Sequence, residues 1–297
     1  MKPFIEQKFG RPRLLIVGCG DVGMRLLPLV RARFRVFAVT SSAERCEQLR
    51  AAGAVPLVAN LDDRASLARL KGLARYVVHL APPPGQGTLD QRSRNLCAIL
   101  PDGARLVYVS TSGVYGDCQG QRIDETRPVA PRNARAIRRV DAERVLRGWA
   151  RRSGSSLAIV RAPGIYARDR LPLERLRLGT PALVEEDDVF TNHIHADDLA
   201  RIVALALMRG LPGRLYNAVD DSEMKMAAYF DAVADAFDLP RPARLARAEL
   251  QLQVSPQLMS FMSESRRIGN DRIKHELGVR LRYPAMLPAL TALANTR

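Results

Sequence analysis

The stretch Leu14-Leu15-Ile16-Val17-Gly18-Cys19-Gly20-Asp21-Val22-Gly23 decides the fold. Its first four residues are apolar and predict a strand buried on both faces, as in a parallel sheet. In the loop that follows, Gly18 permits a tight turn, Gly20 lets the backbone approach a ligand, and Gly23 lets the next helix pack closely on the strand. A helix is expected from about Asp21 to Arg33, and its free N–H groups would hold phosphates. A glycine-rich turn without a ligand is the alternative, but the flanking strand and helix favour a dinucleotide-binding Rossmann unit.

Apolar runs and helix-forming segments alternate along the rest of the chain. Strands are expected at 14–17, 34–39, 55–58, 76–80, 105–110, 157–161 and 214–219, and helices at 21–33, 43–51, 132–152, 196–208 and 224–237. This alternation indicates an α/β fold with a doubly wound parallel sheet. We expect a Rossmann domain over residues 1–165. A smaller substrate-side lobe would cover 166–297, with about 192–222 returning to the sheet.

The end of the second strand bears on the choice of cofactor. NAD sites usually carry an Asp or Glu roughly 20 residues after the glycine loop, where it binds the ribose hydroxyls. Here the strand ends in Thr40, Ser41 and Ser42, with Arg45 just beyond. Hydroxyls and a guanidinium would bind the 2′-phosphate of NADP, although Ser41 or Ser42 could also cap the next helix. The sequence therefore predicts that NADP is preferred to NAD.

Composition narrows the remaining function classes. The chain of 297 residues has a formal net charge of +15, only five of its 46 basic residues are lysine, and aromatic residues make up 5%. A specific nucleic-acid binder would cluster its charge and interleave aromatics, so we expect no such partner. No apolar run reaches the roughly 18–20 residues of a membrane span, and residues 1–13 lack the apolar segment of a secretion signal. Four widely spaced cysteines, without a CxxC pair, favour a cytoplasmic protein with reduced thiols and no metal site.

Four further segments resemble the extended and atypical short-chain dehydrogenases/reductases, the NAD(P)-dependent epimerase/dehydratase type. They are Val107-Tyr108-Val109-Ser110-Thr111-Ser112-Gly113-Val114-Tyr115-Gly116, Val160-Arg161-Ala162-Pro163-Gly164-Ile165-Tyr166, Asn192-His193-Ile194-His195-Ala196-Asp197-Asp198-Leu199-Ala200 and Tyr216-Asn217-Ala218-Val219-Asp220-Asp221. They occur in the family's order and span most of the chain. The resemblance implies an NAD(P)-bound Rossmann domain with a small C-terminal substrate lobe.

The glycine loop and the family positions together give a set of residues expected at the cofactor. They come from the loop, from the ends of the strands and from the long helix: Gly18, Cys19, Gly20, Asp21, Val22, Gly23, Thr40, Ser41, Ser42, Arg45, Asn60, Leu61, Leu80, Ala81, Pro82, Thr111, Arg139, Ala162, Pro163 and Ile165.

The family's catalytic residues are a Ser/Thr and a Tyr-Lys pair spaced as YxxxK. The Ser/Thr position maps to Thr111, five residues before Gly116. The Tyr-Lys pair normally follows a Pro by four residues and precedes a Glu by four. Pro131 and Glu143 fix that register, which puts Arg135 at the Tyr position and Arg139 at the Lys position. The sequence has no Tyr from 116 to 165 and no Lys from 72 to 224, so another register would not restore the pair.

This replacement has a chemical consequence. In the family the Tyr hydroxyl passes a proton, while the Lys lowers the pKa of that hydroxyl and holds the ribose. Arg139 could still bind ribose hydroxyls, whereas Arg135 cannot transfer a proton because a guanidinium stays charged. General acid–base catalysis contributes about 10²- to 10⁴-fold, so the ordinary mechanism cannot run unchanged.

Other side chains near the cleft by family position are candidates for a substitute proton donor. They are Tyr115, Tyr166, His193 and His195, and a histidine titrates close to neutral pH. The plainer interpretation is that the two tyrosines form the pocket wall and that His195, just before a helix start, caps or packs. His79, at the end of the fourth strand, is expected near the nicotinamide in a structural role.

Two functions remain open. The first is an NAD(P)-dependent oxidoreductase or epimerase/dehydratase-like enzyme with a non-standard proton donor, acting on a small molecule that an Arg-rich cleft would favour as an anion. The alternative is a non-catalytic NADP-binding sensor or partner-binding protein. A homodimer through the long helix is an option that the resemblance offers, although residues 135–152 are unusually basic for a self-pairing face.

Overall fold

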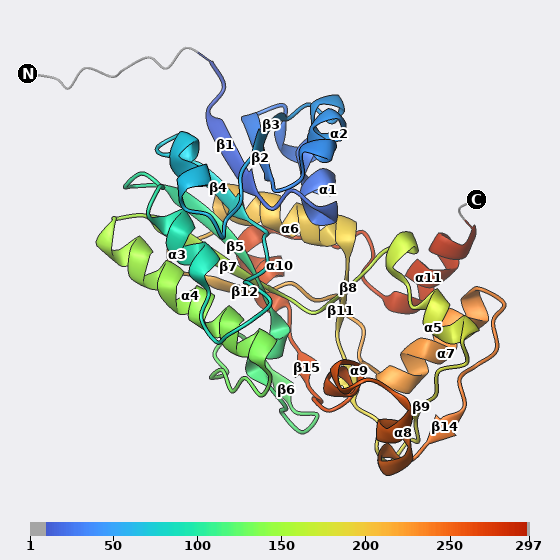
Figure 1. The fold of residues 1–297 in the computed structure, drawn as a ribbon. Helices are drawn as coiled ribbons and strands as arrows, with labels where there is room; N and C mark the ends of the chain where they lie inside the picture. The colour runs from blue at the N-terminus through green and yellow to red at the C-terminus, as the bar shows by residue number, and fades with distance from the viewer. Residues whose placement is uncertain (1–9, 296–297) are drawn as a thin grey trace, which may run out of the picture.

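The computed structural model describes residues 10–295, and its centre is a seven-stranded parallel sheet (Figure 1). The strand order is β12-β7-β5-β4-β1-β2-β3. All seven predicted strands are confirmed, with bounds β1 (Arg13–Val17), β2 (Arg35–Thr40), β3 (Val55–Val58), β4 (Tyr76–His79), β5 (Arg105–Thr111), β7 (Ser156–Ala162) and β12 (Leu215–Asn217). The order reverses between β1 and β4, because the chain winds outward first through β2 and β3 and then through β5 and β7. Such a switch point is where open α/β sheets bind their ligands.

Helices cover both faces of this sheet. On one face α1 (Asp21–Val30), α6 (Ala196–Arg209) and α10 (Asp271–Leu277) share a core with the strands, and on the other α3 (Gln91–Cys97) and α4 (Ala134–Arg152) do so. A short helix, α2 (Cys46–Ala51), precedes β3. The two apolar cores explain why the central strands are apolar on both faces. In the part of the chain that the structure describes, no helix is long and apolar enough to cross a membrane.

Helix α4 is the element that carries Arg135 and Arg139, and a buried ion pair sets its rotation. Glu143 accepts hydrogen bonds from Ser110 Oγ at 2.7 Å and from Arg161 Nε at 3.0 Å, and Arg161 Nη2 lies 2.7 Å from its other oxygen. Both side chains of the pair are about 5% exposed. Because residues four apart share one helix face, this anchor turns positions 135 and 139 toward the same side of α4.

The observed helices differ from the predicted ones mainly at their ends. Helix α4 begins at Ala134 instead of residue 132, because Asn133 caps it by accepting the N–H of Ala136 at 2.9 Å. Helix α1 ends at Val30 instead of residue 33. The segment predicted as helix 224–237 starts with the short strand β13 (Met224–Lys225), and α7 (Met226–Ala236) follows.

The lobe that follows β7 is built from short elements with a core of their own. Its helices are α5 (Leu173–Arg177), α7, α8 (Arg247–Gln253), α9 (Pro256–Phe261) and α11 (Met286–Asn295). Its two-stranded pairs are β8 (Gly164–Tyr166) with β11 (His193–His195), β9 (Ala182–Leu183) with β14 (Arg244–Leu245), and β10 (Phe190–Thr191) with β13, while β6 (Arg122–Ile123) pairs with β15 (Arg267–Ile268). Figure 1 shows α5, α7, α8, α9 and α11 to one side of the central sheet. The domain boundary at residue 165 stays a prediction.

Candidate active site

The glycine loop leaves open space in front of the first turn of α1. Gly18 has a φ of +82°, and a Cβ on it would lie 2.6 Å from the backbone nitrogen of Ala81. A Cβ on Gly23 would lie 2.9 Å from Cys19 Sγ, whereas a Cβ on Gly20 would meet nothing within 4 Å. No side chain caps the start of α1. Open space before uncapped N–H groups suits a phosphate, so the residues present fit the pyrophosphate of a dinucleotide.

Asp21, the first residue of α1, brings a negative charge to this turn. Its carboxylate is paired with Arg25 at 2.9 Å and with Arg170 at 3.0 Å. Arg170 lies in the short η4 helix (Arg168–Arg170), so the second pair joins the loop to the lobe. The charge of Asp21 is thus compensated within the protein, which reduces its repulsion of a bound phosphate.

Hydroxyls and a guanidinium gather at the carboxyl end of β2. Thr40 Oγ1 accepts the N–H of Ser42 at 3.2 Å, and Ser41 is exposed. Ser42 precedes the η1 helix (Ala43–Arg45) but makes no side-chain capping bond, so the expected capping role is not seen. Burial raises the pKa of Cys19 to about 11, and the charge of Arg45 opposes that shift, so Arg45 lies near the glycine loop.

The remaining expected cofactor positions lie at three other strand ends. Residues 60–61 follow β3, residues 80–82 follow β4, and residues 162–165 run from β7 into β8. The N–H groups of Leu80 and Ala81 donate to the carbonyl of Val17 at 2.8 and 3.1 Å, which ties that segment to β1. Of these positions only residues 80–82 border the switch point, and the other two segments follow strands farther out in the sheet.

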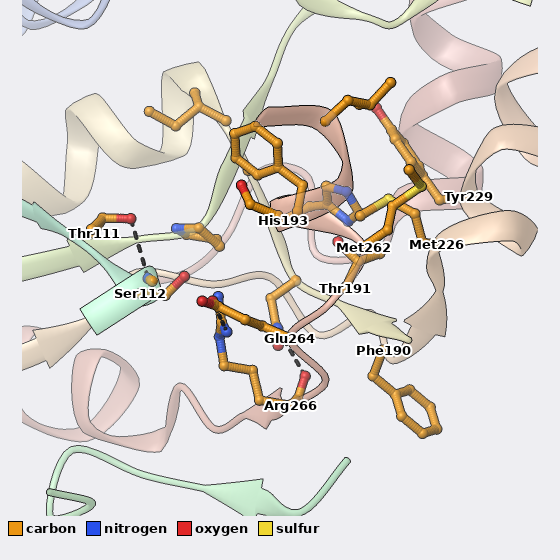
Figure 2. Close-up of a pocket in the computed structure, with 18 of the residues that line it drawn as sticks. Thr111, Ser112, Phe190, Thr191, His193, Met226, Tyr229, Met262, Glu264 and Arg266 are labelled. Carbon is orange, nitrogen blue, oxygen red and sulfur yellow. Dashed lines mark hydrogen bonds and ion pairs between the residues drawn. The ribbon is translucent and has the colours of Figure 1, made fainter. Parts of the chain in front are cut away.

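A pocket of about 580 Å³ lies between the carboxyl ends of β5 and β7 and the lobe. Figure 2 shows Thr111 and Ser112 on one side of it and Met226, Tyr229 and Met262 across from them. Of the residues expected at the cofactor, four line the pocket: Thr111, Arg139, Pro163 and Ile165.

The three family catalytic positions, Thr111, Arg135 and Arg139, line this pocket together. Thr111 Oγ1 accepts the N–H of Gly113 at 3.2 Å, so its own proton is free to be donated. Arg139 Nη1 donates to Tyr108 Oη and to the carbonyl of Val109, both at 2.9 Å, which holds the guanidinium against the end of β5.

Arg135 lies at the rim of the pocket. Its guanidinium carbon is 4.4 Å from the ring centroid of Phe261 in α9, a cation–π geometry that joins α4 to the lobe. Burial lowers the pKa of Arg135, and the carboxylate of Glu264 opposes that shift.

The structure separates the other proton-donor candidates. Tyr115 does not line the pocket: it is 1% exposed, and its hydroxyl donates to Asn217 Oδ1 at 2.8 Å. Tyr166 and His193 do line it. His195 caps α6, as expected, by accepting the N–H of Asp197 at 3.2 Å.

Tyr166 and His193 are poor acids in these surroundings. The hydroxyl of Tyr166 is buried without a hydrogen-bond partner in the protein, and burial raises its pKa. The ring of His193 packs at a tilt against Tyr229 with ring centroids 4.2 Å apart, and burial lowers the pKa of His193 to about 3. A histidine with such a pKa is neutral at neutral pH, so the imidazolium form that would act as a general acid is not populated.

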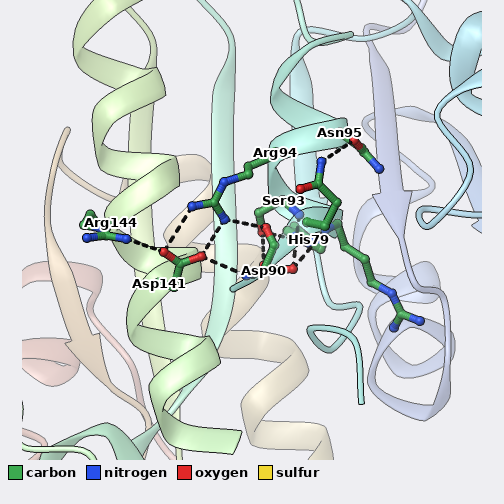
Figure 3. Close-up of polar contacts among 9 residues, drawn as sticks. His79, Asp90, Ser93, Arg94, Asn95, Asp141 and Arg144 are labelled. Carbon is green, nitrogen blue, oxygen red and sulfur yellow. Dashed lines mark hydrogen bonds and ion pairs between the residues drawn. The ribbon is translucent and has the colours of Figure 1, made fainter. Parts of the chain in front are cut away.

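His79 belongs to a buried network on the face of the sheet that α3 and α4 cover (Figure 3). Its Nε2 lies 3.2 Å from Ser93 Oγ, and Ser93 Oγ donates to Asp90 Oδ2 at 2.5 Å. The backbone N–H of Asp90 donates to Asp141 in α4 at 2.8 Å. These three residue types also make nucleophilic triads, but His79, Ser93 and Asp90 are all buried and none lines the pocket. The network joins β4, α3 and α4 and has a structural role.

Several pocket residues were missed by reasoning from the sequence. They come from the lobe and include Arg170, Arg175, Tyr229, Phe230, Phe261, Met262, Glu264 and Arg266. Arg266 pairs with Glu264 at 2.7 Å and donates to the carbonyl of Gly116 at 2.8 Å. No local motif marks these positions, because separate short elements bring them together. Within residues 10–295 no group of three or more His, Cys, Asp or Glu side chains could hold a metal ion.

Fold and site define a class: a Rossmann protein with a phosphate-binding glycine loop beside a pocket that a second lobe closes. The chain belongs to the NAD dependent epimerase/dehydratase family, whose sequence profile matches residues 14–218.

Known proteins similar to this chain extend over nearly its whole length. "Protein YeeZ" of Escherichia coli K12 is 26% identical over 288 residues, which cover 92% of this chain and 96% of that protein. A functionally unknown conserved protein from Silicibacter pomeroyi has a TM-score of 0.77 at 29% identity, covering 95% of this chain and 98% of that one. The dTDP-glucose 4,6-dehydratase DesIV of Streptomyces venezuelae, solved with NAD bound, has a TM-score of 0.75 at 20% identity, covering 95% of both chains.

Proposed function

We propose that the protein is an NAD(P)-dependent oxidoreductase or epimerase/dehydratase-like enzyme that prefers NADP and acts on an anionic small molecule. One observation carries the proposal: the hydroxyl of Thr111 opens into a pocket at the same edge of the sheet as the glycine loop. A substrate in the pocket would therefore lie next to the nicotinamide of a dinucleotide whose pyrophosphate rests on α1. We also propose, from its free thiols, that it works in the cytoplasm.

Thr111, Arg135 and Arg139 would have different roles in the reaction. A nicotinamide bound here would supply or accept hydride. Thr111 would donate a hydrogen bond to the substrate oxygen at the reacting carbon, and Arg139, held by Tyr108 and Val109, would bind ribose hydroxyls with its remaining N–H groups. Arg135 would stabilise negative charge on the substrate without moving a proton.

The charge of the pocket supports an anionic substrate. Five arginines line it, namely Arg135, Arg139, Arg170, Arg175 and Arg266, against the single carboxylate of Glu264. Glu264 is paired with Arg266 and Asp21 with Arg170. The other three guanidiniums lack a carboxylate within 4 Å among the described residues, so an anion would bind them without breaking an ion pair.

The alternative is a non-catalytic NADP-binding sensor or partner-binding protein. The observation in its favour is the set of titratable groups in the pocket: Arg135 stands at the proton-donor position, and the pKa values of Tyr166 and His193 are shifted away from neutrality. The loss of general acid–base catalysis would slow turnover by about 10²- to 10⁴-fold.

A turnover assay separates the two. The enzyme proposal predicts that NADPH absorbance falls with some member of a panel of anionic ketones and aldehydes, and that Arg139→Ala weakens NADPH binding. If wild-type protein binds NADPH but no panel member is reduced, while the double variant Arg135→Tyr, Arg139→Lys gains reductase activity, the sensor function is the correct one.

A further inference from the structure

One part of the lobe side of the pocket is apolar. Its wall there is formed by apolar side chains from α7, from α9 and from the position just after α9, namely Met226, Tyr229, Phe230, Leu258, Phe261 and Met262. Figure 2 shows Met226, Tyr229 and Met262 grouped on the side away from Thr111. Phe230 and Tyr229 also belong to the buried core of the lobe, so this wall is a continuation of packed structure. A ligand part that lies here would be apolar, since a sugar would leave its hydroxyls without partners.

Guanidiniums also lie against this apolar wall: that of Arg135, from α4, on Phe261, and that of Arg175, from α5 of the lobe. The guanidinium carbon of Arg175 lies 4.1 Å from the ring centroid of Phe230, and Nη2 donates to the carbonyl of Pro181 at 2.8 Å. Nη2 also lies 3.8 Å from the sulfur of Met262. Each of these partners belongs to the lobe and none is charged, so the guanidinium is held in place without a counter-ion.

The charge of Arg175 is only partly compensated. Among the described residues no carboxylate forms an ion pair with it, and its Nε is buried with no acceptor in the protein. Burial lowers the pKa of its guanidinium to about 10. A half-buried, unpaired charge costs free energy in the ligand-free protein. An acidic group of a ligand would supply the missing acceptor and the missing charge at once.

We infer that Arg175 anchors the acid group of a substrate whose body is aliphatic or aromatic, so that the pocket takes an apolar carboxylic acid and not a nucleotide. This deepens the proposed function, on which it rests, by naming the substrate class of the same pocket. The reacting carbonyl of such a molecule would lie at Thr111, and its acid group at the far, lobe end. The three lobe elements α5, α7 and α9 would then set specificity.

The test uses aryl-alkanoic acids, from phenylacetate to 5-phenylpentanoate, each paired with its neutral amide. Binding to the full chain is measured by calorimetry, with and without saturating NADPH. A charge-assisted hydrogen bond to a buried guanidinium predicts that at least one acid binds about 10-fold or more tightly than its amide. Arg175→Gln should remove this preference, and Arg175→Lys should keep part of it. Arg177→Gln is the matched control, because Arg177 lies on the same helix, is exposed and does not line the pocket.

Stability gives a readout that a purely structural role would not produce. If Arg175 is kept for ligand binding, Arg175→Met should have a Tm equal to or above that of the wild type, because it removes an unpaired charge from apolar surroundings. A clear loss of Tm in Arg175→Met would show that the arginine serves folding.

Three outcomes overturn the inference: equal binding of acids and amides, binding of neither series, or binding of uridine diphosphate more tightly than any acid. The titrations with NADPH test the proposed function separately from the substrate class. If NADPH binds and the acids do not, only the proposed substrate class is wrong. If the acids bind and NADPH does not, Arg175 still binds an acid group but the protein is not a dinucleotide-dependent enzyme.

Discussion

At the scale of single residues, Arg45 is the side chain that we expect to bind the 2′-phosphate of NADP. It lies near the glycine loop, close enough for its charge to affect the thiol of Cys19. Arg45→Glu should weaken NADPH binding about 10-fold or more, through loss of a charge-assisted bond to the 2′-phosphate and the gain of a like charge. NADH, which lacks that phosphate, should be affected far less. Calorimetry with both cofactors measures this.

Arg50→Glu is the control for that variant. Arg50 lies in the following helix α2 and is exposed, and its substitution by Glu changes the net charge by the same amount. If Arg50→Glu weakens NADPH binding as much as Arg45→Glu does, the effect comes from overall charge and the assignment of Arg45 is wrong.

At the scale of elements, the orientation of α4 depends on the buried pair of Glu143 and Arg161. Glu143→Ala leaves Arg161 charged and unpaired in the core, which should lower the free energy of unfolding by about 3–5 kcal/mol. Urea unfolding measures the loss. Arg144→Ala, on the same helix, breaks an ion pair whose arginine is 73% exposed, and should cost under about 1 kcal/mol. Equal losses in the two variants would contradict this role for Glu143.

The same helix shows why the positions of the Rossmann half could be predicted from the sequence. Pro131 and Glu143 fixed the register of positions 135 and 139, and the structure explains the value of Glu143, because this residue bonds to β5 and to β7. The strands were predictable because each contains a short apolar run, which is a local property of the sequence, although the edge strand β3 is not buried. The cap at Asn133 moved the helix start by two residues, a detail that depends on side-chain geometry.

At the scale of the whole molecule, Asp220 lies in the core after β12, where the sheet meets the lobe. It is 4% exposed, its backbone N–H donates to the carbonyl of His193 at 2.8 Å, and its Oδ2 has no partner in the protein. Burial raises its pKa to about 7, and the charges of Asp221 and Asp198 add to that rise. The folded state therefore binds this proton more tightly than the unfolded chain, so stability falls as pH rises from about 4 to about 7.

Asp220→Asn removes this ionisation while keeping an acceptor for the N–H of Ser222. The variant should gain stability over the wild type by roughly 1 kcal/mol for each pH unit between about 4 and 7, with no further gain above. Urea unfolding of both proteins at pH 5 and pH 8 checks it. A difference in unfolding free energy that stays constant between the two pH values would contradict the raised pKa.

The lobe shows where sequence reasoning stopped. Arg175, Phe230 and Met262 meet at the pocket from α5, from α7 and from the position just after α9. Helix α7 was predicted from the sequence, but its pattern does not show which of its side chains face a pocket. Tyr115 is a candidate proton donor by family position, yet it is buried outside the pocket lining, where its hydroxyl donates a hydrogen bond to Asn217. Such placements follow from tertiary packing between distant segments, and local pattern does not determine them.

The central claim is that the glycine loop and the end of β2 form an NADP-preferring dinucleotide site. Calorimetric titration of the wild-type protein with NADPH and with NADH tests it most directly. We expect both cofactors to bind, and NADPH to bind about 10-fold or more tightly than NADH. Equal affinities, or tighter binding of NADH, would contradict the preference for NADP, and no binding of either would contradict the site itself.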